Sequence, residues 1–73
     1  MICKTPWLRV DGKIFRTIIV DQSDGYMVKK EWGTGYFSDS RFHSSIEMAY
    51  SDWLQKFTEY LSDGHGFAKN QND

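Results

Sequence analysis

The residue types that could supply a nucleophile, an acid–base pair or a metal ligand are few and scattered in this chain. Cys3 is the only cysteine, and the only histidines are His43 and His65. A cysteine nucleophile needs a base beside it, and no histidine lies near Cys3 in the sequence. A zinc site needs cysteines and histidines at short spacing, which the chain lacks. We therefore expect no enzymatic activity, no metal and no cofactor.

The surroundings of both histidines also favour structural roles. His43 lies in the serine-rich run "SDSRFHSS", which is typical of a turn and a helix cap. The segment "DGHG" offers Asp63 and His65, too few ligands for a metal site. Three carboxylates, Asp52, Glu59 and Asp63, fall outside the apolar pattern around them and indicate a solvated helix face.

The stretch "KKEWGTGYF" has the glycines of a phosphate loop without its remaining residues. A Walker loop reads GxxxxGK[ST], and a dinucleotide-binding loop reads GxGxxG between a strand and a helix. Gly33 and Gly35 are followed by neither a third glycine nor a suitably placed lysine. We interpret Gly33-Thr34-Gly35 as a bend that ends a strand, after which Tyr36 and Phe37 continue it briefly.

Two turns organise the first half of the chain. Asp11-Gly12 lies between extended runs and is typical of a two-residue hairpin loop, which sets Leu8 opposite Phe15 and Trp7 opposite Arg16. The second turn, "DQSDGY", admits two registers. A two-residue loop at Asp24-Gly25 pairs Ile19 with Lys30, whereas a four-residue loop from Gln22 to Gly25 pairs Ile19 with Val28.

Register decides which side chains share a face of the sheet. We prefer the four-residue loop because it gathers large apolar side chains on one face. One face then carries Leu8, Phe15, Ile19, Val28 and Trp32. The other carries Ile14, Arg16, Ile18, Val20, Met27, Lys29 and Glu31.

A helix should follow the polar turn. Ser44 and Glu47 match a capping box, and Gly64 is well placed just past the helix end. Between them, apolar residues recur at helical spacing: Ile46, Ala49, Tyr50, Trp53, Leu54, Phe57 and Leu61. We expect an α+β fold in a single domain, 1–73. It comprises a three-stranded antiparallel meander (about 7–37) and one amphipathic helix (about 45–62) packed on one face, with a polar tail (64–73) that frays.

Composition limits the classes of function. The net charge of −1 is not that of a dedicated phosphate-backbone binder, which usually has a strongly basic face. The first ten residues contain no apolar run long enough for a secretion signal, and no segment is apolar enough to cross a membrane. A single free cysteine fits a reducing compartment. We expect a soluble, cytoplasmic protein.

The sheet face opposite the helix is the predicted binding surface, because small monomers rarely leave an apolar patch exposed without a use for it. Arginine, tryptophan, tyrosine and methionine are also the residue types that protein interfaces favour. The candidate partner-binding residues are Trp7, Arg9, Arg16, Met27, Lys29 and Lys30. Two alternatives remain: residues 36–43 or the C-terminal tail cover this face, or it forms a homodimer.

The segment "GYFSDSRFHSSIEMAYSDWL" resembles the passage from third strand to helix in AP2-like domains and in the arm-binding domains of tyrosine recombinases. The likeness spans residues 7–62 and places Phe42, Ile46, Ala49 and Trp53 in packing positions. It implies a sheet that enters the DNA major groove, with Arg9, Arg16, Lys29 and Lys30 as contacts. The acidic helix, the net charge and the outward Ile14 and Ile18 depart from that pattern.

In type, the chain resembles the small single-domain inhibitors encoded by phages and other mobile elements, including anti-CRISPR proteins. The shared features are its size, the lack of a catalytic motif, a pI near 6.0 and many aromatic residues. The resemblance implies a non-enzymatic protein-binding domain that sterically blocks a host nucleic-acid-processing or defence complex. We adopt this hypothesis, with a small DNA-binding domain as the alternative.

Overall fold

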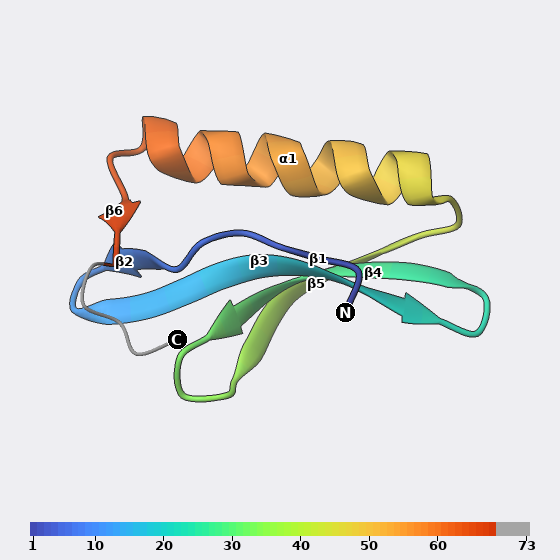
Figure 1. The fold of residues 1–73 in the computed structure, drawn as a ribbon, viewed down its shortest axis with the longest axis horizontal. Coiled ribbons are helices and arrows are strands. Elements are labelled where there is room, and N and C mark those ends of the chain that lie inside the picture. The colour runs from blue at the N-terminus through green and yellow to red at the C-terminus, as the bar shows by residue number, and fades with distance from the viewer. Residues whose placement is uncertain (69–73) are drawn as a thin grey trace.

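The computed structural model describes residues 1–68 and shows one helix lying across one face of a single antiparallel sheet (Figure 1). The strand order is β5-β4-β3-β2-β6, and β1 also pairs with β3. In chain order the elements are β1 (Cys3–Lys4), β2 (Leu8–Val10), β3 (Lys13–Gln22), β4 (Gly25–Trp32), β5 (Phe37–His43), α1 (Ile46–Ser62) and β6 (Gly66–Phe67). The α+β class is confirmed, but the expected three strands undercount a six-stranded sheet.

The predicted hairpin registers are confirmed. Leu8 lies opposite Phe15, and β4 pairs with β3 in the preferred register, with Ile19 opposite Val28. The second loop is shorter than expected, because Gln22 and Gly25 also pair and leave only Ser23 and Asp24 between the strands. At the first turn, positive φ at Asp11 (50°) and Gly12 (78°) matches the type I′ geometry that Asp-Gly favours.

Residues 38–43, expected as a polar turn, form most of strand β5. The strand pairs with β4 through a register shift between Val28 and Lys30, and Asp39 has a positive φ of 54°. Hydrophobic alternation could not reveal this strand, because hydrogen bonds fix its inner side chains. The Trp32 indole donates to the Ser38 hydroxyl, and the Arg41 guanidinium donates to Asp52 on α1.

The N-terminal segment is a further addition to the expected sheet. β1 pairs with the far half of β3, setting Cys3 opposite Ile19, whereas β2 pairs with the near half. Between these strands Thr5 is buried, and its hydroxyl accepts a hydrogen bond from the backbone N–H of Thr17 at 3.0 Å. The chain therefore follows β3 in two separate pieces joined at Thr5.

The helix begins one residue later than the capping box suggested. Ser45, not Ser44, is the N-cap, and its hydroxyl accepts a hydrogen bond from the Met48 N–H. The C-terminal end is as predicted: Gly64 has a φ of 88° just past the helix. The His65 N–H bonds the Tyr60 carbonyl and the Gly64 N–H the Leu61 carbonyl, the pairing of a Schellman motif.

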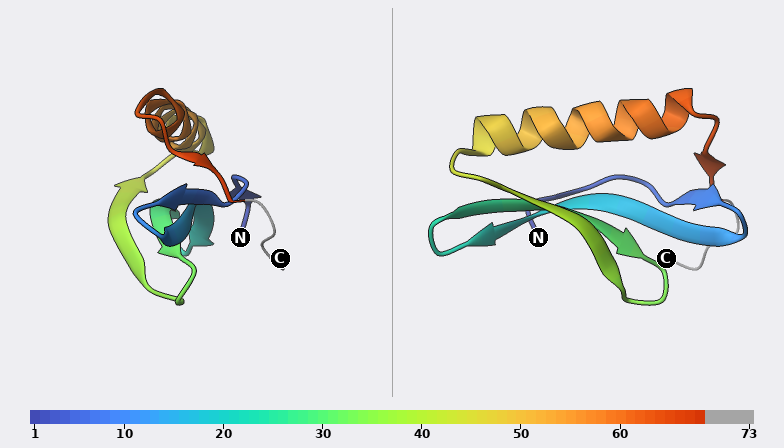
Figure 2. Two further views of the ribbon diagram at one scale, coloured as in Figure 1. Left: turned by 90° about the vertical axis from the view of Figure 1, so that its left-hand side faces the viewer. Right: turned by 180° about the vertical axis from the view of Figure 1, so that it is seen from behind.

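The core lies between α1 and the sheet face that the sequence assigned to it. The end-on view in Figure 2 shows α1 lying over the sheet. Leu8, Phe15, Ile19, Val28 and Ala49 are fully buried. The Trp53 indole N–H, which comes from α1, donates to the Thr17 carbonyl of β3 at 2.8 Å. Fully burying such side chains stabilises a fold by about 1.5–3 kcal/mol each, and this thin layer is therefore the main source of stability.

Part of the expected frayed tail is ordered. Gly66 and Phe67 form β6, which pairs with β2, and the Ala68 N–H donates to the Trp7 carbonyl at 2.9 Å. The Schellman motif reverses the chain and makes this pairing possible. The remainder of that expected tail, residues 69–73, lies outside the described residues.

Candidate functional site

The sheet face turned away from α1 is the predicted binding surface, and we call it the open face. The strand pairings place these side chains on it: Lys4, Arg9, Ile14, Arg16, Ile18, Val20, Met27, Lys29, Glu31, Phe37 and Phe42. The expected bare apolar patch is absent among them, because Ile18 is only 1% exposed and Ile14, Val20 and Met27 are half-buried. β5 explains part of this cover, since Phe42 lies opposite Met27.

Long cationic side chains of the open face are held against rings and one carboxylate. The Arg16 guanidinium lies 4.4 Å from the centre of the Trp7 ring, and its Nε is 2.7 Å from Glu31 Oε1. The Lys29 ammonium lies 5.0 Å from the centre of the Phe37 ring. Aliphatic stems of such residues cover apolar surface while their charged ends stay at its rim. The open face is therefore a mixed cationic and aromatic surface.

Two other cations of the open face are exposed. Within residues 1–68, neither Lys4 nor Arg9 forms an ion pair. On β5, at the other edge of this face, Phe37 and Phe42 remain 45% and 47% exposed. In the paired strand positions this face thus carries four cations and one carboxylate, together with rings available for contact.

Of the six predicted binding residues, Lys30 lies on the opposite side of the sheet. Its ammonium is 4.6–5.2 Å from the ring centres of Phe15, Trp32 and Tyr60, and 3.5 Å from Asp39 Oδ2. Side chains alternate along a strand, so two adjacent lysines must face opposite ways. Lys30 therefore belongs to the rim of the core. Arg9, Arg16, Met27 and Lys29 lie on the open face, with Trp7 against Arg16.

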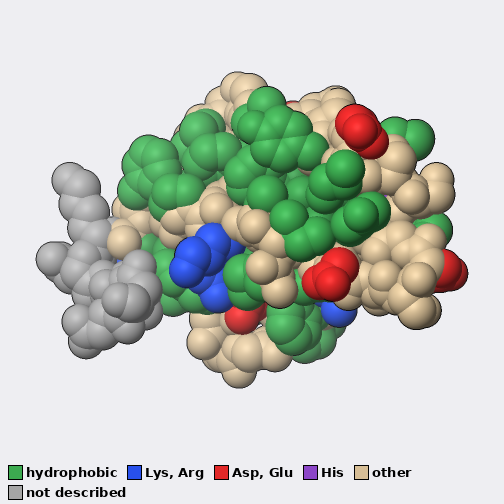
Figure 3. All heavy atoms as spheres, turned by 45° about the vertical axis from the view of Figure 1, so that its right-hand side comes forward, with side chains coloured by type: hydrophobic (Ala, Val, Ile, Leu, Met, Phe, Trp, Pro, Cys, Tyr) green, Lys and Arg blue, Asp and Glu red, His purple; other side chains and the backbone are tan. Residues whose placement is uncertain are grey.

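Sequence reasoning missed a second surface, formed by α1. Tyr50, Leu54 and Leu61 belong to the apolar stripe but are 48%, 44% and 38% exposed. The stripe is wider than the part of α1 that contacts the sheet. The Asp52 carboxylate, on the other side of the helix, is hydrogen-bonded to Arg41 and His43 of β5, so these three side chains face away from β5. We call them the helix surface. Figure 3 shows apolar side chains gathered over this side of the molecule.

A junction of three side chains ties β5 to α1. Asp52 Oδ2 lies 2.7 Å from Arg41 Nε and 2.8 Å from His43 Nε2. Burial by itself raises the pKa of the Asp52 carboxyl, but the hydrogen bonds and charges of Arg41 and His43 outweigh burial and lower that pKa below its ordinary value. The junction fixes how α1 is rotated over the sheet.

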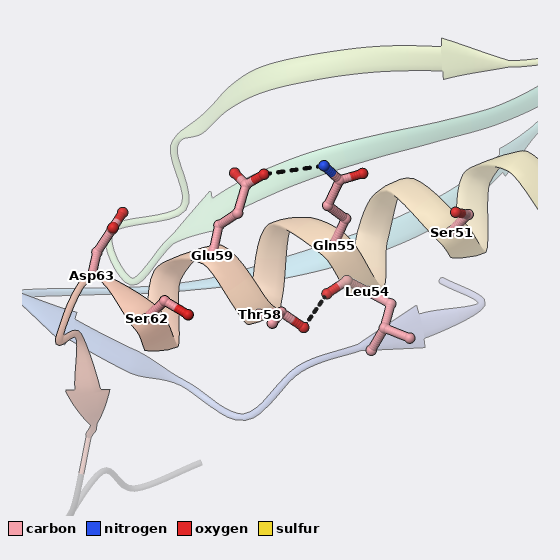
Figure 4. Close-up of a pocket in the computed structure, with 7 residues that line it drawn as sticks. All are labelled: Ser51, Leu54, Gln55, Thr58, Glu59, Ser62 and Asp63. Carbon is pink, nitrogen blue, oxygen red and sulfur yellow. Dashed lines mark hydrogen bonds between the residues drawn. The ribbon is translucent and has the colours of Figure 1, made fainter.

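Among the chemistry-bearing residues weighed in the sequence, the structure brings His43 and Asp52 together, within the junction that they share with Arg41. Cys3 packs against the core beside Ile19, and His65 stacks on Tyr60. Within residues 1–68 no cluster of three metal-ligating side chains forms. A shallow hollow along α1 is lined only by exposed residues, and its side-chain hydrogen bonds stay within the helix (Figure 4). These arrangements support structural roles.

No protein-family model, curated protein or solved structure matches the chain. Among residues 1–68, no helix has the length and apolar content needed to cross a membrane. The functional argument therefore rests on the open face and the groups around it.

Proposed function

We propose that this chain is a non-enzymatic protein-binding domain that uses its open face to cover an acidic surface of a partner. The observation that carries the proposal is the paired arrangement of Arg16 on Trp7 and Lys29 on Phe37, on one face beside the exposed Arg9. Side chains already held in place lose less conformational entropy on binding, which favours affinity. Arginine and aromatic residues also dominate binding hot spots.

The charges on the open face favour a protein partner over a nucleic-acid backbone. Arg16 is committed to Glu31, and that carboxylate would face any phosphate brought near it. Lys30, one of the four cations expected on this face, lies on the other side of the sheet. Nucleic-acid affinity grows with the number of phosphates neutralised, and this face offers few free charges for that purpose. A protein surface with carboxylates and apolar groups matches both its cations and its rings.

The mechanism we propose is steric occlusion. A domain of this size covers a functional surface without any chemistry of its own, as the likeness in type to small mobile-element inhibitors implies. The partner in this proposal is a host complex that processes nucleic acid or acts in defence. Its acidic docking surface would be blocked by the open face.

The test is a tagged pull-down from bacterial lysate, with and without nuclease, read by mass spectrometry. The variant pair Arg9→Gln with Lys29→Gln removes two positive charges and leaves Arg16 and Glu31 intact. We avoid reversing Arg16, because a glutamate there would face Glu31 and unfold the sheet locally. The control pair Ser51→Glu with Thr58→Glu changes the net charge equally, at exposed positions on α1.

We expect a protein partner that survives nuclease treatment, with affinity about tenfold weaker for the Arg9/Lys29 variant, or ~1.4 kcal/mol, and unchanged for the control. Equal binding by both variants would show that the open face is the wrong surface. Loss of binding in a Leu54→Ser variant alone would move the site to the helix surface. Sedimentation of the purified chain tests the homodimer alternative, which predicts a dimer that the Arg9/Lys29 pair disrupts.

One observation favours the alternative, a DNA-binding sheet: in its paired strand positions the open face carries more cations than carboxylates, four against one. Under this alternative, all captured proteins disappear after nuclease treatment. Duplex affinity would then fall steeply with salt, because each neutralised phosphate releases counterions. Capture of a protein that survives nuclease treatment contradicts the alternative.

A further inference from the structure

A hollow of about 700 Å³ lies where the β2–β3 hairpin meets the turn between β4 and β5. Its lining includes Arg9 and Lys13 from the first hairpin and Trp32, Tyr36 and Ser38 from the second. The two hairpins are fastened together at its base, because the Gly33 N–H donates to the Ile14 carbonyl at 2.9 Å. We call it the hairpin hollow. Its volume falls in the range of small-molecule sites, which is about 300–1,000 Å³.

One wall of the hairpin hollow is cationic. Arg9 and Lys13 come from the β2–β3 hairpin, and both are exposed. Neither forms an ion pair within residues 1–68, and no carboxylate lines the hollow. Strand alternation sets Arg9 and Lys13 on different faces of the hairpin, and both line the hollow at its end. Two cations beside a hollow without a neutralising acid favour an anionic ligand, which arginine holds through charge-assisted hydrogen bonds.

The opposite wall is aromatic and comes from the β4–β5 turn. Trp32 is fixed, because its indole N–H donates to Ser38 Oγ at 2.9 Å and its ring packs on Phe15 with centres 5.3 Å apart. Tyr36 is 65% exposed, so its ring is free to stack on a ligand. The turn is closed by two backbone bonds between Trp32 and residues 35 and 36, which hold this wall in place.

We propose that the hairpin hollow binds a nucleoside phosphate, with the base on Tyr36 and the phosphate on Arg9 and Lys13. Such a ligand has the two parts that the two walls require, a flat ring and an anion. Stacking on an aromatic side chain tolerates every base, so the site is expected to select for the phosphate and the ring together. Arg9 also lies on the open face, whereas Lys13 and Tyr36 do not, so variants at Lys13 and Tyr36 test this proposal separately from the protein-binding function.

The experiment is a titration of the full chain with 5′-AMP, followed by two-dimensional ¹H–¹⁵N NMR. We expect the amide signals of Gly12, Gly33 and Gly35 and the Trp32 indole signal to shift together, with saturation below about 10 mM AMP. Trp32→Phe identifies the indole signal. Adenosine supplies the ring alone and inorganic phosphate the anion alone. Each should bind about tenfold more weakly than AMP, because each engages only one wall.

Two variants test the walls separately. Lys13→Gln and Tyr36→Ala should each raise the Kd for AMP about tenfold, and Lys56→Gln on α1 should leave it unchanged. All three positions are on the surface or its rim, so an unchanged spectrum outside the hairpin hollow shows that the variants fold. Absence of shifts at the hollow up to about 10 mM AMP, or equal Kd values for all variants, would overturn the proposal.

A 5′-phosphorylated trinucleotide distinguishes a free nucleotide from the end of a strand. Binding equal to that of AMP assigns the site to a free nucleotide. Binding more than about tenfold tighter, with the same shifts, assigns it to a strand end. Both results support the hairpin hollow as the site. Shifts confined to the open face on trinucleotide addition would contradict it and support the DNA-binding alternative.

Discussion

His43 Nε2 on β5 lies 2.8 Å from Asp52 Oδ2 on α1, and Arg41 shares the same oxygen. This one carboxylate joins the outermost strand of the sheet to the helix. Its bonds with Arg41 and His43 connect residues 38–43, expected as a turn, to the helix as part of strand β5. It also sets the rotation of α1 that leaves Tyr50, Leu54 and Leu61 exposed.

The first prediction concerns the strength of this junction. Asp52→Asn should lower the free energy of unfolding by about 1–3 kcal/mol, because Arg41 and His43 would lose a charged acceptor. Urea denaturation measures the change. Glu59→Gln is the control, since its carboxylate is paired near the surface with Lys56 and should matter by less than about 1 kcal/mol. Equal effects of the two substitutions would contradict a special role for Asp52.

The second prediction is the pH dependence of the same junction. Because the pKa of Asp52 in the folded protein is lowered, the unfolded chain binds this proton more tightly. The stabilisation is therefore complete above the unfolded pKa, near the ordinary value of 3.8, and is lost as pH falls through the folded pKa. The difference in unfolding free energy between wild type and Asp52→Asn should shrink below that pH. A constant difference from pH 7 down to about 2 would rule out the ionic contribution.

The third prediction separates two adjacent lysines. Lys30→Ala should destabilise the fold by about 1–2 kcal/mol, because three rings and Asp39 surround its ammonium. Lys29→Ala, on the open face, should have an effect of less than about 0.5 kcal/mol. Chemical denaturation of both variants provides the comparison. Lys30→Met retains most of the stem, so recovery of stability with methionine would assign the effect to packing rather than to charge.

The fourth prediction is steric. A Cβ at Gly25 would lie 2.5 Å from the Phe42 ring and 2.6 Å from the His43 carbonyl oxygen. Gly25→Ala should therefore force β4 and β5 apart and lower stability by about 1–3 kcal/mol. Gly66→Ala is the matched control, because nothing lies within 4 Å of its Cβ position. Thermal melts that show equal losses for both variants would contradict this account of the β4–β5 contact.

The parts of the fold that local chemistry determines were predictable. Asp11-Gly12 set one hairpin, alternation around Ile19 and Val28 selected the other register, and Gly64 marked the helix end. β5 was not predictable in this way, because its inner contacts are polar and its partner Asp52 lies on α1. β1 and β6 are two residues long and exist only through pairing with strands formed elsewhere.

The candidate site was predicted in outline and differs in detail. The division of the sheet into two faces was right, and alternation alone would have placed Lys30 on the helix side. Sequence could not show that Ile18 is buried, because one of its two cross-strand neighbours, Lys4, lies on β1, a strand that the sequence did not reveal. It also could not show how much of the apolar stripe of α1 the small sheet would leave exposed.

The irregular course of β5 has a consequence for how this protein meets others. β5 is the outer strand of the sheet in the described chain, and the register shift opposite Val28 to Lys30 and the positive φ of Asp39 interrupt its regular backbone. An uneven border is a poor template for another strand, and proteins use such breaks to prevent sheets from joining edge to edge. The irregular backbone of β5 therefore disfavours the pairing of this edge with a strand of a second chain.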